Sequence, residues 1–143
     1  MSLREMSQLF YQIKLLDQKI TQLFEHVTGF SLTRYEMIME ISQNNGCSQN
    51  RLQEHLQIDS AAVTRHLKVL EEKGYVTRKR NPENNREVLV YLTDKARKSI
   101  EKCHEHQTLL QKAIDESFTQ SDLHQTVDLL RKLDDSLNTI TEE

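Results

Sequence analysis

The chain has 143 residues and a net charge of −3, with 36% hydrophobic and 29% charged residues. This length fits one compact domain, or one domain with an appended arm, and is too short for two independent cores. No apolar run approaches the roughly 20 residues that a membrane-spanning helix needs, which argues against a transmembrane protein. Because the N-terminus shows no secretory signal, we expect a cytoplasmic protein with no membrane partner.

Turn-forming residues are scarce, with three glycines and one proline in the whole chain. This scarcity disfavours a sandwich or barrel, which needs frequent turns, and predicts a mostly helical fold. The two cysteines, Cys47 and Cys103, are too few and too far apart for a disulfide framework or a Cys-x-x-Cys pair.

The charged residues are divided unevenly along the chain. Residues 48–98 hold 11 Lys/Arg against 7 Asp/Glu, a net of +4, whereas the remaining residues have a net of −7. A basic centre between acidic flanks is typical of a protein that binds a polyanion.

The first segment predicts a long amphipathic helix. Its apolar residues recur at spacings of three and four from Met6 to Val27, which is the seam of a helix that packs on another helix. In the next helix we expect Thr33 as the N-cap, with Glu36 closing a capping box, and the Asn-Asn-Gly run at 44–46 as the end.

Two further helices and a tight turn follow. Ser48 is placed to cap a short helix, residues 57–59 supply a three-residue turn, and Asp59 caps a longer helix. Gly74 is placed to end that helix in a left-handed conformation.

The pattern then changes from helical to extended. Segments 75–80 and 87–92 are rich in β-branched and aromatic residues, and the stretch 81–85 between them predicts the loop of a hairpin. Thr93 begins a helix that is expected to continue to an interruption at 117–121, and a last helix carries an apolar seam. The predicted fold class is therefore mostly α with a small β-hairpin.

The helix after Asp59 has two different faces. Val63, Leu67 and Leu70 lie together on one side, whereas Arg65 and Lys68 project on the other. Short residues followed by Arg and Lys suit entry into a DNA major groove, although these charges also fit a solvated face paired with glutamates of the same helix.

The order of elements strengthens the nucleic-acid interpretation. A short helix, a turn, a second helix and a basic hairpin together describe a winged helix-turn-helix. The hairpin charges have a second explanation, since arginines and lysines also protect exposed strand edges from aggregation.

The run from Leu32 to Leu92 resembles the multiple antibiotic resistance regulator (MarR) family. The resemblance rests on Leu32-Thr33, the segments 59–65 and 70–76, Arg78, Asn81-Pro82, Arg86 and Leu92-Thr93. It implies a bacterial transcriptional regulator, usually a repressor, that binds a palindromic double-stranded DNA operator as a winged-helix homodimer. It also implies the division into an N-terminal dimerisation helix (1–30), a winged helix-turn-helix (31–93) and C-terminal dimerisation helices (94–143).

On this basis three groups of residues are expected to contact DNA. The recognition helix contributes Ser60, Ala61, Ala62, Thr64, Arg65 and Lys68. The helix before it contributes Ser48, Gln49 and Arg51. The wing contributes Arg78, Lys79 and Arg86. The chain departs from the family at Asn84, where the wing usually carries an Asp two residues before its Arg. An amide lacks the charge-assisted, bidentate geometry with which a carboxylate holds a guanidinium.

The resemblance also implies a crevice for a small, often anionic aromatic effector whose binding releases DNA. The candidates to line it are Phe10, Phe24, His26, Phe30 and Tyr35. The same aromatic residues also fit ordinary core and dimer-interface packing.

Other chemistries find less support in the sequence. Cys47 precedes a helix N-terminus that could lower its pKa, which leaves open a redox-sensing regulator. His104 and His106 point apart on a helix, so we expect no metal site, and no cofactor or catalytic motif is recognisable. A winged helix that binds only protein is a further alternative, but it predicts acidic or apolar residues where Arg65 and Lys68 stand.

Overall fold

A computed structural model of the chain describes residues 1–141 and contains two compact units. The first unit is Met1–His106, and the second begins at Gln107. Within the described residues, no helix is long and apolar enough to cross a membrane.

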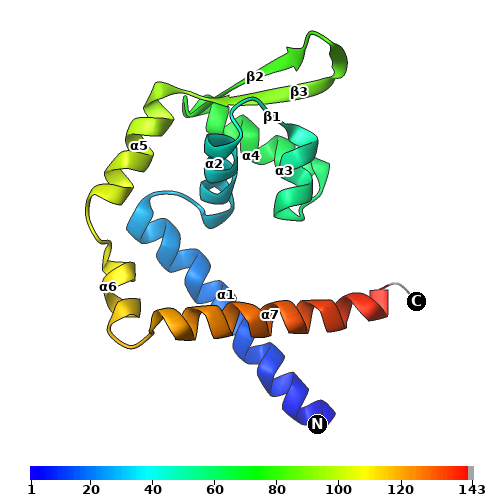
Figure 1. Cartoon of the computed structure of the whole chain (residues 1–143), viewed down its shortest axis with the longest axis vertical. Coiled ribbons are helices and arrows are strands. Elements are labelled where there is room, and N and C mark those ends of the chain that lie inside the picture. The colour runs from blue at the N-terminus through cyan, green and yellow to red at the C-terminus, as the bar shows by residue number, and fades with distance from the viewer. Residues whose placement is uncertain (142–143) are drawn as a thin grey trace. The chain divides into compact units, whose positions relative to one another are not determined.

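The first unit holds five helices and a small sheet. Figure 1 labels each of these elements. In chain order they are α1 (Leu3–Thr28), α2 (Leu32–Gln43), β1 (Cys47–Ser48), α3 (Gln49–Leu56), α4 (Ser60–Glu72), β2 (Val76–Asn81), β3 (Asn84–Leu92) and α5 (Asp94–Glu105). The predicted class, mostly α with a β-hairpin wing, is confirmed.

The sheet has one strand more than the sequence indicated. Its order is β1-β3-β2, and all pairs are antiparallel. The two residues of β1, Cys47 and Ser48, pair with Val90 and Leu89. The hairpin turn is also tighter than expected, because β2 and β3 pair as far as Asn81 and Asn84.

The core of the first unit lies where α2, α3 and α4 meet the sheet. Its largest fully buried side chains are Met37, Ile38, Ile41, Leu52, Val63, Leu67, Leu70, Val76 and Val90. Burying each such side chain stabilises the fold by about 1.5–3 kcal/mol relative to leaving it in water. Because α4 uses Val63, Leu67 and Leu70 for the core, its opposite face stays at the surface.

Most helix boundaries follow the predicted caps. Ser48, Asp59 and Thr93 cap α3, α4 and α5, each accepting a hydrogen bond from a backbone N–H three residues on. The prediction for α2 was wrong by two residues, because Ser31 and not Thr33 is its N-cap.

The second unit contains α6 (Leu109–Asp115) and α7 (Gln120–Thr141). The sequence predicted one helix from Thr93 to residue 116, and this was wrong. The backbone of His106 is extended, and Thr108 starts a new helix through a capping box with Gln111. Residues 142 and 143 of the predicted C-terminal arm lie outside the described residues.

Candidate nucleic-acid interface

Helix α4 presents a polar face to solvent. Its N-cap Asp59 accepts a hydrogen bond of 2.7 Å from the amide of Ala62, which fixes where the helix starts. The predicted recognition residues Ser60, Ala61, Thr64, Arg65 and Lys68 are all exposed, and Ala62 is half-buried. The residues nearest the N-terminus are short, so that end of the helix can approach a base pair closely.

Arg65 and Lys68 are available for a ligand. Among residues 1–141, neither side chain takes part in an ion pair, although the sequence allowed both to pair with Glu71 or Glu72. Glu71 instead accepts two hydrogen bonds from Arg78 of β2, at 3.1 and 3.2 Å.

The Arg78–Glu71 pair joins the wing to α4. It is bidentate, a geometry that fixes the guanidinium in direction as well as in distance. The hydrogen bonds from Arg78 lower the pKa of the Glu71 carboxyl below its usual value of 4.5. A phosphate contact by Arg78 therefore requires the guanidinium to share or leave this carboxylate.

The remaining wing cations are differently placed. The Lys79 ammonium lies 5.9 Å from the centre of the Tyr91 ring, and Arg80 donates to the backbone carbonyl of Asn85. The exposed Arg86 donates its backbone N–H to Asn84 Oδ1 at 3.2 Å. Asn84 thus binds the backbone of Arg86, and the guanidinium is left at the surface.

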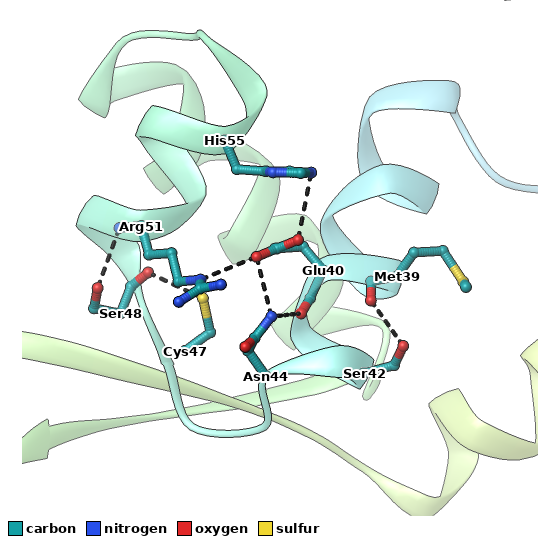
Figure 2. A network of polar contacts seen from close by, with 8 residues as sticks. All are labelled: Met39, Glu40, Ser42, Asn44, Cys47, Ser48, Arg51 and His55. Carbon is teal, nitrogen blue, oxygen red and sulfur yellow. Dashed lines mark hydrogen bonds and ion pairs between the residues drawn. The ribbon is translucent and has the colours of Figure 1, made fainter.

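The N-terminus of α3 carries the third predicted group. Ser48 accepts a hydrogen bond from the amide of Arg51 at 3.1 Å, while Gln49 is half-buried. The Arg51 guanidinium donates through Nε to Glu40 Oε1 at 3.0 Å (Figure 2). Helix N-termini with a nearby arginine suit phosphate binding, because backbone N–H groups and positive charge act together.

Sequence comparison identifies the family. The model of the MarR family matches residues 30–88. The HTH-type transcriptional regulator YdgJ of Bacillus subtilis (strain 168) is 37% identical over 136 residues, which is 95% of this chain and 83% of that protein. The chain belongs to the MarR family. It is therefore a DNA-binding transcriptional regulator with a winged-helix fold.

Two solved structures of DNA-bound proteins resemble this chain over most of its length. A mutant MarR from E. coli complexed with operator DNA has a TM-score of 0.77 and 26% identity, covering 93% of this chain and 99% of that one. Reduced AbfR bound to DNA has a TM-score of 0.79 at 23% identity, covering 96% and 95%, and supports the fold alone.

Sequence reasoning missed two acidic residues that bind arginines of the candidate interface, Glu40 and Glu71. The sequence suggested Glu71 only as a partner within its own helix, whereas it binds an arginine of the wing. Glu40 had a visible signal, since it lies three residues after Met37, on the buried side of α2, where a charge needs a partner.

The predicted effector crevice is only partly assembled in this MarR family member. Phe24 and Phe30 both pack edge-on against Tyr35, with ring centroids 5.2 and 6.4 Å away. Tyr75, which was not predicted, joins Phe30 at 5.4 Å. Phe10 is exposed and lies 14 residues before Phe24 on α1, about 21 Å along the helix axis.

The remaining crevice residue and the cavities of the first unit can also be compared with the predicted effector crevice. His26, the fifth predicted crevice residue, is exposed. A cavity of about 30 Å³ beside Phe30 and Tyr75 has room for a water and not for an aromatic ring. A larger pocket of about 280 Å³ lies elsewhere, among Ser42, Asn45, Leu92, Arg97, Ile100 and Glu101.

The environment of Cys47 differs from the expectation. Its side chain is 4% exposed, and burial, with a further contribution from Glu40, raises the pKa of the thiol above its usual value. The helix N-terminus therefore does not produce a low-pKa thiol, and a reactive thiolate is disfavoured.

The histidines do not gather around a metal position in the part of the chain that the structure describes. Within residues 1–141, no three His, Cys, Asp or Glu side chains are close enough to hold an ion. His104 instead forms a 2.9 Å hydrogen bond with the hydroxyl of Tyr35, which links α5 to α2.

Proposed function

We propose that this chain is a homodimeric repressor that binds an inverted-repeat operator. In this proposal residues 31–93 of each subunit contact DNA, and residues 1–30 and 94–143 form the dimer interface. Two α4 helices related by a twofold axis would enter successive major grooves about 34 Å apart. The observation that carries the proposal is the exposed face of α4, with Arg65 and Lys68 outside any ion pair of the described chain.

The contacts divide by the type of DNA group. We assign base edges and neighbouring phosphates to Ser60, Ala61, Ala62, Thr64, Arg65 and Lys68 of α4. The backbone phosphates are assigned to Ser48, Gln49 and Arg51 at the start of α3 and to Arg78, Lys79 and Arg86 of the wing. Phosphate contacts supply affinity and position, whereas base contacts supply specificity.

The dimer proposal is supported by apolar surface on each unit taken separately. On α1, the exposed side chains include Leu9, Leu16, Ile20 and Leu23, which follow the seam seen in the sequence. On α7, Leu123, Leu130, Leu137 and Ile140 are likewise exposed along one seam. Exposed apolar stripes of this kind mark protein–protein contacts.

Release by a small aromatic or anionic effector is part of the proposal. Its support is the aromatic cluster of Phe24, Phe30 and Tyr35, which joins α1 to α2 beside the DNA-binding elements. A redox mechanism through Cys47 is the weaker alternative, because that thiol is buried.

The test is retention of random-sequence DNA duplexes by the immobilised full chain. The double variant Arg65→Ala with Lys68→Ala is expected to lose more than about tenfold in affinity, because it removes both unpaired α4 cations. The matched control, Arg4→Ala with Lys14→Ala, removes one exposed arginine and one exposed lysine from the side of α1 opposite its apolar seam and is expected to retain DNA. Equal retention by both double variants would contradict the proposed interface. The sign of regulation is measured separately, with a reporter gene placed behind a retained sequence, whose expression should fall.

A further inference from the structure

Glu40 is a buried carboxylate at the contact between α2 and α3. It is 6% exposed, and each of its oxygens is used: Oε1 lies 3.0 Å from Arg51 Nε and Oε2 lies 3.4 Å from His55 Nε2. Asn44 Nδ2 adds a hydrogen bond of 3.2 Å to Oε1. Figure 2 shows these three side chains converging on the carboxylate.

The network holds Arg51 by one edge only. The Arg51 side chain is 56% exposed, and among the described residues its guanidinium donates to Glu40 alone, through Nε. The terminal nitrogens at the other end of the planar group therefore remain free to donate. Arg51 also lies in the first turn of α3, whose N-cap is Ser48, so unpaired backbone N–H groups are nearby.

We propose that Glu40 is a positioning residue for DNA binding, which holds the Arg51 guanidinium so that its terminal nitrogens meet a backbone phosphate. This inference rests on the proposed function, because it assumes that the α3 N-terminus meets DNA. A guanidinium is a rigid fork, so fixing Nε fixes the direction of its other donors. Fixing them before binding reduces the side-chain entropy that the phosphate contact must overcome.

The proposal predicts that loss of the Glu40 carboxylate weakens DNA binding, whereas its negative charge alone predicts that the loss strengthens binding. Removing a carboxylate near a polyanion is expected to strengthen binding, because one repulsion disappears. If Glu40 positions Arg51, its removal weakens binding instead. Glu40→Gln suits this comparison, because it removes the charge at nearly constant volume. One neutral amide oxygen must then serve both Asn44 Nδ2 and Arg51 Nε, so the guanidinium loses the charge-assisted hydrogen bond that holds it.

The experiment measures affinity and salt dependence of the full chain for a fluorescent pool of random-sequence duplexes. Glu40→Gln and Arg51→Ala are each expected to lower affinity about three- to tenfold, the size of one partly exposed charge-assisted hydrogen bond. Each should also reduce the slope of log affinity against log salt by about 0.9, the value for one phosphate contact. In the Arg51→Ala background, Glu40→Gln should cause no further loss. The matched control Glu54→Gln removes an exposed carboxylate of α3 and should leave binding unchanged or slightly tighter.

Three results would overturn the inference. In the first, Glu40→Gln binds DNA as tightly as the wild type or more tightly, which would show that the Glu40 charge only opposes DNA. In the second, Glu40→Gln lowers affinity by the same factor in the Arg51→Ala background as in the wild type, which would show a purely structural role. Arg51→Lys gives the third test and does not depend on folding of the Glu40 variant. Lysine keeps the charge but lacks the fork, so positioning predicts affinity near that of Arg51→Ala, and wild-type affinity would contradict it. Failure of the wild-type chain to bind any duplex would instead overturn the proposed function and the inference with it.

Discussion

Arg65 and Lys79 carry the same charge, but their surroundings predict different effects on DNA binding. Arg65 lies on the exposed face of α4, four residues after Ala61, where it can reach base edges. Lys79 lies on the outer strand of the wing over the Tyr91 ring, and we assign it to a backbone phosphate. One substitution should therefore change specificity and the other should change affinity alone.

Arg65→Ala should weaken binding to the preferred sequence by about 1–3 kcal/mol and relax the choice of base at one position of each half-site. The measurement is sequencing of the duplexes that the variant retains, compared with those retained by the wild type. An unchanged sequence preference would remove Arg65 from the residues that contact bases.

Lys79→Ala should weaken all sequences alike, because a phosphate contact carries no sequence information. The slope of log affinity against log salt should fall by about 0.9 for each phosphate that the variant no longer neutralises. Binding isotherms at several salt concentrations, with preferred and scrambled duplexes in parallel, measure both quantities. Weaker binding of the preferred duplex alone would contradict the assignment.

At the scale of the helices and strands, the helix boundaries that depend on neighbouring residues could be predicted from the sequence. The caps Ser48, Asp59 and Thr93 act through their own side chains on amides three residues away, so their positions are visible in the sequence. The break after α5 was visible in principle as well. Thr108 and Gln111 form a Thr-x-x-Gln capping box, which the expectation of one helix from Thr93 onward overlooked.

What the sequence could not predict depends on contacts between distant segments. The strand β1 is two residues long and exists because Cys47 and Ser48 pair with β3, more than 40 residues later. Its residues carry too little local β preference to predict a strand. The same holds in the candidate site, where Glu40 and Glu71 acquire their roles from arginines on other elements.

The link between α4 and the wing predicts a pH dependence. Arg78 holds the pKa of Glu71 below its usual value, so the pair stabilises the fold above that value, and the contribution is lost as pH falls through the lowered pKa. Glu71→Gln should reduce the free energy of unfolding at neutral pH by less than about 1 kcal/mol, because the pair is partly exposed. The difference from wild type should vanish in acid. Urea unfolding of both proteins across the acidic range measures it, and a difference that grows as pH falls would contradict this account.

At the scale of the whole molecule, charge and apolar surface are segregated. The positive excess lies within residues 48–98, whereas α1 and α7 carry the exposed apolar seams. This division fits a regulator whose centre binds DNA and whose terminal helices bind a second copy. The net charge of −3 does not reveal this uneven distribution of charge along the chain.

Leu130→Asp together with Leu137→Asp should yield monomers or unfolded chain, because both residues lie on the α7 seam and are exposed in the single chain. The control is Ser121→Asp with Thr139→Asp, which adds the same two charges to the side of α7 that faces away from the leucine seam. Sedimentation analysis should find the control dimeric. A well-folded dimer of the leucine variant would exclude the last helix from the interface.

The central claim, that the chain recognises an inverted repeat as a dimer, is tested most directly by sequencing the random duplexes that the purified protein retains at two salt concentrations. We predict enrichment of a palindrome of about 16–20 base pairs, with half-sites one helical turn apart and affinity that falls steeply with salt. Enrichment of a sequence without twofold symmetry, or none at either salt concentration, would contradict the account.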